Sequence, residues 1–378
     1  MEDRIKNNFC SLPFGHTTVT TNGNFAVCCI HDAPADAQVN INNQKIDHWL
    51  KSEYLQEVKQ AFRNNERPPG CNKCWNVEDL GQASMRNRTA KEYKILGVDE
   101  STEFPVNIEV QLGNLCNLSC LMCSEIFSSA ILAENIKLKI NKHNQDDFKW
   151  TDAGFENLQE IISTGPKVLT VIGGEPFYNK KFLSILESLP LEACRQTLLH
   201  IVTNATQWDQ RWANALSKFK LVRMMFSIDG TESLYEYIRY PGVWETVNSN
   251  IDQIMSGANI KPLVNTTVQN LNIGSIGSII EWSKEKNLYL QLVQLIQPSW
   301  LTITNLPRPL KIKAVDHLET VLTWDLTDHL QQQLGSYHTQ LTNSLAQPDD
   351  LEAWATFQAQ VGMRDSLRNN SYKRFLDY

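Results

Sequence analysis

The sequence has no long hydrophobic run, no excess of basic residues and no internal repeat. No stretch approaches the roughly 18 apolar residues of a membrane-spanning helix, and the N-terminal residues MEDRIKNNFC lack the apolar stretch of a signal peptide. The formal net charge of −7 over 378 residues argues against a surface dedicated to nucleic-acid binding. We therefore expect a cytoplasmic protein without membrane or dedicated nucleic-acid partners.

The composition, with 42% hydrophobic and 20% charged residues, is typical of a folded globular protein. The length favours one large domain with appendages. Residues 1–104 are polar and rich in cysteine, with an expected hairpin around Asn22 and Gly23 and an expected helix at 46–64. This segment contains too little apolar material for a strong core of its own.

From residue 105 to about 300, strand-like segments alternate with helical ones. The expected strands are 106–113, 167–174, 197–204, 221–230, 262–269 and 288–296, and the expected helices are 125–141, 153–164, 179–188, 208–217, 231–256 and 274–286. Runs of Val, Ile and Leu separated by amphipathic helices indicate an α/β fold with a parallel sheet. Six such units suit an open or partial barrel with its site at the C-terminal strand ends. Residues 301–378 are expected to be mainly helical.

Eight of the nine cysteines lie in the first third of the chain, and the ninth, Cys194, is expected in the core. Cytosolic thiols are kept reduced, so clustered cysteines there are more often metal ligands than disulfides. Cys116, Cys120 and Cys123 form C-x3-C-x2-C directly after the first strand of the alternating region. Structural zinc normally takes a fourth ligand, whereas a [4Fe-4S] cluster on three thiolates keeps one iron open. The alternative is three buried structural thiols.

With this motif the sequence resembles the radical S-adenosylmethionine (SAM) superfamily. The resemblance extends to Gly173, Gly174, Glu175 and Pro176 at the end of the second strand, which look like the family's GGEP contact to the amino group of SAM. Paired glycines permit close backbone approach and a carboxylate accepts from an ammonium, although the tetrapeptide alone could be a turn. The resemblance implies a partial (β/α)6 barrel over 105–300, a [4Fe-4S] cluster on the three cysteines and SAM chelated to its open iron.

Weaker matches to the family follow at later strand ends. Ser227 and Asp229 resemble polar positions that contact the SAM ribose, and Arg239 resembles an arginine that pairs with the SAM carboxylate. Arg239 also fits a solvated helix arginine, and the strand-end residues Thr203, Asn204 and Thr267 also fit ordinary turns. The resemblance further implies SAM contacts for Thr203, Asn204, Thr267 and Met122, a thioether at a position that is often aromatic in the family.

Four N-terminal cysteines form two pairs, C-x12-G-x4-C from Cys10 to Cys28 and C-x2-C from Cys71 to Cys74. Four thiolates fit either structural zinc or a second iron-sulfur cluster. Cys29 is an alternative to Cys28, because adjacent side chains point to opposite faces of a strand. The spacing resembles the family's SPASM and twitch modules, which usually follow the barrel. The resemblance implies a shortened, twitch-like module with one auxiliary [4Fe-4S] cluster, here placed before the barrel.

The resemblance implies an enzyme that cleaves SAM to a 5′-deoxyadenosyl radical and removes hydrogen from a substrate. Relatives with such modules mostly modify peptides or proteins, so we expect that substrate class, with flavodoxin or ferredoxin as the electron donor. One alternative is a small metabolite or nucleotide substrate. Another is a non-enzymatic iron-sulfur electron carrier or zinc-stabilised scaffold, which would leave GGEP and the strand-end polar residues without a role.

Overall fold

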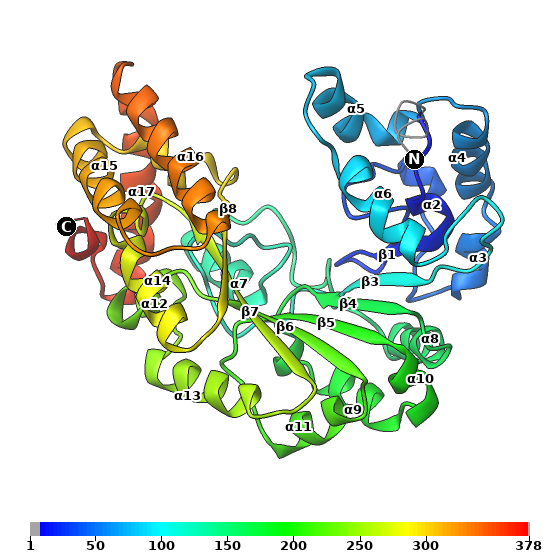
Figure 1. The fold of residues 1–378 in the computed structure, drawn as a ribbon. Coiled ribbons are helices and arrows are strands. Elements are labelled where there is room, and N and C mark those ends of the chain that lie inside the picture. The colour runs from blue at the N-terminus through cyan, green and yellow to red at the C-terminus, as the bar shows by residue number, and fades with distance from the viewer. Residues whose placement is uncertain (1–7, 377–378) are drawn as a thin grey trace. The chain divides into compact units, whose positions relative to one another are not determined.

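All six strands expected in the α/β region are present in the computed structural model, which describes residues 8–376. The strands are β1 (His16–Val19), β2 (Phe25–Ala26), β3 (Asn107–Gln111), β4 (Val168–Ile172), β5 (Leu198–Thr203), β6 (Leu221–Ser227), β7 (Ile260–Val268) and β8 (Tyr289–Gln294). They form one sheet in the order β2-β1-β3-β4-β5-β6-β7-β8 (Figure 1). The pairs β3–β4, β4–β5 and β7–β8 are parallel, which confirms the α/β class.

The helices follow the expected alternation, and the C-terminal region is helical as expected. They are α2 (Leu12–Gly15), α3 (Ile46–Leu50), α4 (Glu53–Arg63), α5 (Asn72–Asp79), α6 (Met85–Ile95), α7 (Ser129–Leu138), α8 (Asp152–Ser163), α9 (Lys180–Ser188), α10 (Leu191–Gln196), α11 (Gln210–Ser217), α12 (Glu232–Ile238), α13 (Trp244–Met255), α14 (Ile276–Glu285), α15 (Arg308–Leu322), α16 (Asp328–Leu345) and α17 (Leu351–Arg368). The expected helix 231–256 is divided, because Pro241 has no amide hydrogen to continue α12. Helix α10 was not expected, and it contains the fully buried Cys194. Within residues 8–376, no helix is long and apolar enough to cross a membrane.

Strands β3–β5 have two unlike faces. One face is apolar and almost completely buried, and it is made of Ile108, Val110, Leu169, Val171, Leu199 and Ile201. Helices α8–α11 lie on one side of these strands (Figure 1). On the opposite face, the strand register places Glu109 beside Thr170 and Thr170 beside His200. Because successive side chains alternate between faces, polar residues inside apparently continuous apolar runs collect on one side of the sheet.

The expected N-terminal hairpin is present and also extends the main sheet. Strand β1 pairs antiparallel with β2, and Gly23 in the connecting turn has a φ of +85°. Strand β1 pairs in parallel with β3 as well, with Thr18 opposite Glu109. The pairing joins segments that are far apart in the sequence, so no local pattern indicates it.

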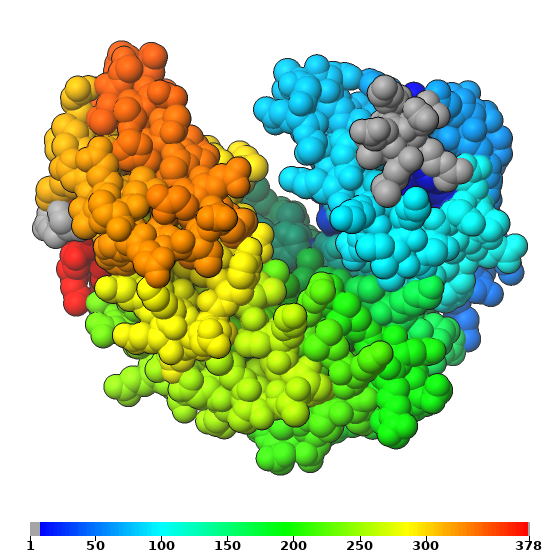
Figure 2. All heavy atoms as spheres, viewed as in Figure 1, coloured from blue at the N-terminus to red at the C-terminus, as the bar shows by residue number. Residues whose placement is uncertain are grey.

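The chain divides into two compact units. The first contains Met1–Leu115, His143–Ile201 and Asp209–Arg223, and the second contains Cys116–Lys142, Val202–Trp208 and Met224–Tyr378. In the first unit, helices α2–α6 gather near β1 (Figure 1). In the second unit, α15 packs along α16, and Figure 2 shows their side chains as one continuous surface. The domain bounds 1–104, 105–300 and 301–378 remain predictions.

Buried His16 in β1 gives the first unit a predictable response to acid. Its ring nitrogens contact the Tyr93 hydroxyl at 2.8 Å and the Thr18 hydroxyl at 3.0 Å, and burial lowers its pKa to about 4. An unfolded histidine titrates near pH 6.5, so between pH 7 and 5 the unfolded state binds a proton that the folded state does not. We expect this residue to reduce the free energy of unfolding by about 2 kcal/mol over that range, measured by urea denaturation. His16→Asn should flatten the pH dependence, whereas His48→Asn at an exposed position should not. Equal slopes in both variants would contradict this account.

Candidate functional site

The three thiols of C-x3-C-x2-C lie in the loop between β3 and α7, as expected. Cys120 is buried, and the other two motif thiols are partly exposed. Two backbone hydrogen bonds fix the loop: the Ser119 amide donates to the Tyr240 carbonyl at 2.6 Å, and the Leu121 amide donates to the Ile238 carbonyl at 2.9 Å. The middle cysteine is therefore held against the segment that follows α12.

The electrostatic surroundings of these thiols suit an anionic ligand set. Burial raises the pKa of Cys120 and raises that of Cys123 to about 12. The guanidinium of Arg239 opposes the shift at Cys120, and its Nη1 lies 3.8 Å from the Cys120 Sγ. Cysteine binds metal as thiolate, so binding releases the thiol protons. The guanidinium beside Cys120 therefore offsets part of the effect of burial and favours the thiolate form that an iron-sulfur cluster needs.

Arg239 and Asp229 form a buried ion pair, with 2.7 Å between Nη2 and Oδ2. The other carboxylate oxygen accepts a hydrogen bond from the Thr267 amide at 2.7 Å. Asp229, Arg239 and Thr267 therefore belong to one network in the second unit. Ser227, which is the last residue of β6, is half-buried. The sequence suggested the SAM carboxylate as the partner of Arg239, and the structure pairs it with Asp229. The Arg239 Nε has no hydrogen-bond partner among the described residues, so one donor remains for a bound anion.

Asn204 connects the end of β5 to the cysteine loop within the second unit. Its Nδ2 donates to the Asn117 Oδ1 at 3.1 Å, and the Asn117 Nδ2 donates to the Thr206 hydroxyl at 2.8 Å. Asn117 directly follows the first motif cysteine, and Met122 in the same loop is partly exposed. Asn117 and Thr206 were not among the expected site residues, although each lies within two residues of one, Cys116 and Asn204.

The GGEP motif follows β4 in the first unit. Gly173 and Gly174 have φ values of +83° and +53°, a region that favours glycine. A Cβ on Gly174 would lie 2.3 Å from the Leu115 carbonyl oxygen, and the Glu175 amide donates to the same oxygen at 2.8 Å. Leu115 immediately precedes Cys116, so the motif is hydrogen-bonded to the start of the cysteine loop.

Glu175 and Pro176 also have a structural role. Glu175 is only 2% exposed, and it caps a short 3₁₀ helix (Pro176–Tyr178) by accepting from the Phe177 amide at 3.0 Å. The turn interpretation of GGEP is therefore correct as local structure. This turn is compatible with the predicted contact to the amino group of SAM, because two glycines without side chains leave the backbone close to the surface, where a ligand can approach it.

Replacing Gly174 with alanine should be more harmful than replacing a glycine that has only an unusual φ. Gly81 is the matched control, because it has a φ of +74° and no atom within 4 Å of an added Cβ. Left-handed strain alone costs about 1 kcal/mol, so we expect Gly81→Ala to lose about that much and Gly174→Ala to lose about 2 kcal/mol or more. Chemical denaturation of both variants measures the difference, and equal losses would exclude the close contact with Leu115.

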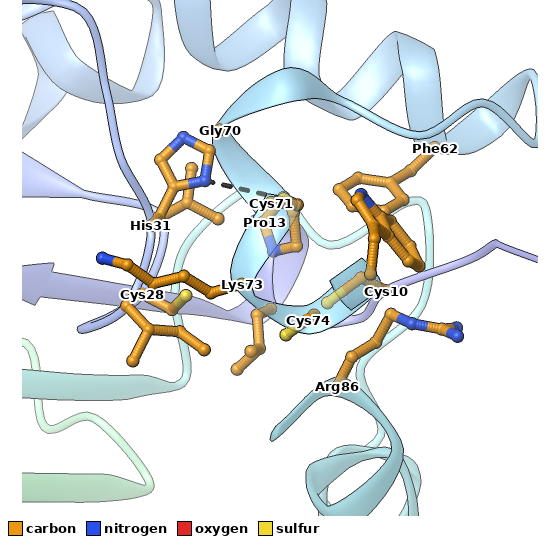
Figure 3. A pocket seen from close by; sticks show the side chains of 14 residues that line it. Cys10, Pro13, Cys28, His31, Phe62, Gly70, Cys71, Lys73, Cys74 and Arg86 are labelled. Atoms are coloured by element: carbon orange, nitrogen blue, oxygen red, sulfur yellow. Dashed lines mark hydrogen bonds between the residues drawn. The ribbon is translucent and has the colours of Figure 1, made fainter. Parts of the chain in front are cut away.

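Four cysteines line one pocket in the first unit (Figure 3). Cys10 precedes α2, Cys28 follows β2, and Cys71 and Cys74 lie at the start of α5. The pocket encloses about 360 Å³, open solvent at its mouth included, and Arg86 from α6 also lines it. The structure thus brings together the four residues that the sequence suggested as one ligand set.

Cys28 and Cys29 have different surroundings. Cys28 lines the pocket, whereas the Cys29 Sγ lies 3.9 Å from the Met85 Sδ and Cys29 does not line it. Burial, with smaller contributions from the nearby Cys71 and Cys74, raises the pKa of Cys28 to about 12. Thiols that hinder each other's ionisation can share a bound cation, which favours Cys28 over Cys29 as the ligand.

His31 is a neighbour of this pocket that the sequence analysis overlooked. Its Nδ1 lies 3.6 Å from the Cys71 Sγ (Figure 3). Its Nε2 lies 2.7 Å from the Tyr54 hydroxyl. Gly70 leaves room for the ring, since a Cβ there would lie 2.4 Å away. Over residues 8–376, no three Cys, His, Asp or Glu side chains are arranged to hold a single metal ion. In the sequence, the only indication that His31 lies near the cysteines is its position three residues after Cys28.

The polar face of β3–β5 was also overlooked. The Arg223 Nη1 at the start of β6 lies 3.5 Å from the His200 Nε2, and burial, with help from Arg223, lowers the pKa of His200 to about 4. Burial raises the pKa of Glu109 on the same face. Among the described residues Arg223 has no ion-pair partner within 4 Å. The alternation in NIEVQ and LLHIVT was the signal for this face.

Two segments of the chain match known domains. Residues 110–268 match the radical SAM superfamily. The chain carries a radical SAM domain. Residues 10–75 match the iron-sulfur cluster-binding domain called SPASM, which here precedes the radical SAM domain as the cysteine spacing suggested. The two matches confirm the resemblance and assign to the chain a SAM-binding [4Fe-4S] cluster and an auxiliary iron-sulfur cluster.

Curated proteins that are similar to this chain match it over part of their length. The sporulation killing factor maturation protein SkfB of Bacillus subtilis is 23% identical over 177 residues, 47% of this chain and 39% of SkfB. AdoMet-dependent heme synthase of Methanosarcina barkeri is 26% identical over 186 residues, 49% of this chain and 48% of that protein. The crystal structure of Streptococcus suis SuiB bound to precursor peptide SuiA aligns with a TM-score of 0.42 and 14% identity, covering 74% of this chain and 60% of SuiB. The chain spans less than half the length of these two curated relatives.

Proposed function

We propose that this protein is an enzyme that reductively cleaves SAM and uses the 5′-deoxyadenosyl radical to remove a hydrogen atom from a substrate. The observation that carries the proposal is the loop of Cys116, Cys120 and Cys123, which follows β3 inside a radical SAM domain. Cys116, Cys120 and Cys123 would hold a [4Fe-4S] cluster, which would offer an open iron to SAM and supply the electron for cleavage of its carbon-sulfur bond. A flavodoxin or ferredoxin is the proposed electron source, and reduced thiols fit the expected cytoplasmic location.

The chain's own residues would bind and orient SAM. The two glycines of GGEP bring backbone close to a ligand, and the unpartnered Nε of buried Arg239 is a donor for a carboxylate. Asn204 is oriented by its bond to Asn117 beside the cysteine loop. The proposed SAM-binding set is Met122, Gly173, Gly174, Glu175, Pro176, Asn204, Ser227, Asp229, Arg239 and Thr267.

We propose that Cys10, Cys28, Cys71 and Cys74 hold one auxiliary [4Fe-4S] cluster. Their shared pocket and the match to an iron-sulfur cluster-binding domain support iron over zinc. Four thiolates would leave no open iron, so this cluster would relay electrons or stabilise the N-terminal segment rather than bind SAM. Zinc in place of iron after anaerobic reconstitution would remove this part of the proposal.

A peptide or protein is the proposed substrate. The similarity to SkfB, a maturation protein by its name, supports this class, while the similarity to a heme synthase supports a small-molecule alternative. The polar face with Glu109, His200 and Arg223 supplies hydrogen-bonding groups that either kind of substrate could use. The distinguishing experiment is anaerobic incubation with a peptide library and with a metabolite extract, each in deuterated form, followed by detection of deuterium in 5′-deoxyadenosine.

The proposal is tested first without any substrate. After anaerobic cluster reconstitution and reduction with dithionite, the protein should convert SAM into methionine and 5′-deoxyadenosine, measured by liquid chromatography and mass spectrometry. A protein that contains a reduced cluster and forms no 5′-deoxyadenosine would instead support the non-enzymatic electron-carrier hypothesis.

A further inference from the structure

A buried arginine at the end of the C-terminal helix contacts the cysteine loop. Arg368 is the last residue of α17, and its side chain is 2% exposed. Its Nη2 donates to the Ser119 carbonyl at 2.6 Å, in the peptide unit that joins Ser119 to Cys120. The amide of the same Ser119 donates to Tyr240, so both backbone groups of the residue before Cys120 are occupied.

Arg368 is itself held in place by its surroundings. Its Nε donates to the Glu134 Oε2 at 3.0 Å and its Nη2 donates to the Glu134 Oε1 at 2.9 Å. Glu134 is buried in α7, the helix that follows the cysteine loop. The guanidinium also lies 4.8 Å from the centre of the Tyr240 ring. A planar fork with several donors can satisfy all these groups at once, whereas a lysine cannot.

A nearby arginine, Arg364, makes it possible to distinguish the effect of the loop contact from that of the ion pair with Glu134. Arg364, one turn earlier on α17, is also buried and pairs with Glu134, with 3.2 Å between Nε and Oε1. Its other contacts are to Asn135 and to Gln360 in its own helix, and none is to the cysteine loop. The two arginines therefore share the pairing with Glu134, and the hydrogen bond to Ser119 belongs to Arg368. A cation near a helix C-terminus is common, but such a residue is normally exposed.

We propose that Arg368 is a positioning residue for the SAM-binding cluster, which fixes the Ser119 carbonyl and thereby the place of Cys120 in the loop. The C-terminal helices, to which the sequence assigned no role, would then form part of the cluster site. This inference rests on the proposed cluster ligation by Cys116, Cys120 and Cys123, but its first test requires no metal.

The test compares Arg368→Met with the matched control Arg364→Met in the full-length, metal-free protein. Iodoacetamide modification of each cysteine is followed by mass spectrometry. Loss of a buried charge-assisted hydrogen bond should increase local opening, so we expect alkylation of Cys120 to accelerate by on the order of tenfold in Arg368→Met. In Arg364→Met the change should stay below about threefold, because that variant loses contacts to Glu134, Asn135 and Gln360 but keeps the Arg368 hydrogen bond to Ser119. Similar rates in both variants, or an unchanged rate in Arg368→Met, would overturn the proposal.

A second readout keeps the proposal testable if Arg368→Met folds poorly. Arg368→Lys retains the charge but lacks the planar fork, and its Cys120 should alkylate at an intermediate rate.

In reconstituted protein, only a cluster with an open iron should change its electron paramagnetic resonance spectrum on addition of SAM. We expect Arg368→Lys to alter that change at normal iron content while Arg364→Lys does not, and identical spectra would refute the inference. A failure of the wild type to bind iron at this motif would defeat the proposed function and leave the alkylation result interpretable.

Discussion

Replacing Cys116, Cys120 and Cys123 with alanine is expected to abolish 5′-deoxyadenosine formation and to leave about four iron atoms per chain. The reason is that these thiols are proposed to hold the SAM-binding cluster, whereas the four cysteines of the N-terminal pocket belong to a separate ligand set. Both quantities are measured on anaerobically reconstituted protein, iron by a colorimetric assay and the nucleoside by mass spectrometry. The loss of activity should be complete rather than graded, because no other cluster in the proposal has an open iron that could bind SAM.

The matched control replaces Cys194, which is buried in α10 and lies on no motif. Cys194→Ala should retain full iron content and activity at some cost in stability. Replacing Cys71 and Cys74 should give the converse iron result, with about four iron atoms retained at the SAM-binding loop. Residual deoxyadenosine formation in the triple variant, or complete loss of iron from it, would contradict the assignment of two independent clusters.

Replacing Arg239 with glutamine is expected to lower the free energy of unfolding by about 3 kcal/mol, because it leaves the Asp229 carboxylate buried without its partner. Burial already raises the pKa of Asp229, and removal of the guanidinium raises it further. A carboxyl whose folded pKa lies above its unfolded value of about 3.9 stabilises the protein below that pH and loses this effect as pH rises through the folded pKa. The loss should therefore be larger at pH 8 than at pH 5, as measured by denaturation at both values.

Two further variants test the same pair. Asp229→Asn in the Arg239→Gln background should recover part of the lost stability, since it removes the uncompensated charge. Lys286→Met breaks the more exposed pair with Asp252 in the same unit and should change stability little. Arg239→Gln should also weaken SAM binding without loss of iron. If the affinity for SAM is unchanged in Arg239→Gln, Arg239 does not bind SAM and is only a structural partner of Asp229.

Short-range sequence patterns were sufficient to predict much of the fold and of the candidate sites of this protein. The six strands of the α/β region were found because Val, Ile and Leu runs of strand length are bounded by turn residues and separated by amphipathic segments. The cysteine motif and GGEP were found because each lies within a few residues at the end of one strand. The N-terminal ligand set was also accessible, because two short-range spacings of cysteine limit the possible groupings.

Contacts between distant segments could not be found in the same way. Pairing of β1 with β3, selection of Cys28 over Cys29, and the proximity of His31 to Cys71 depend on how loops are placed around the sheet. The polar face of β3–β5 became visible only when the register placed Glu109, Thr170 and His200 side by side.

The sequence by itself determined the chemistry: three thiols at fixed spacing, a glycine turn after the next strand and four further cysteines. Only the tertiary structure decided which charges surround that chemistry. Arg239 looked like a helix residue facing solvent or SAM and is paired with Asp229, and Arg368 carried no signal at all yet contacts Ser119. The physical reason is that a buried charge is stable only beside a partner, and for Arg368 that partner is supplied by a segment remote in the chain.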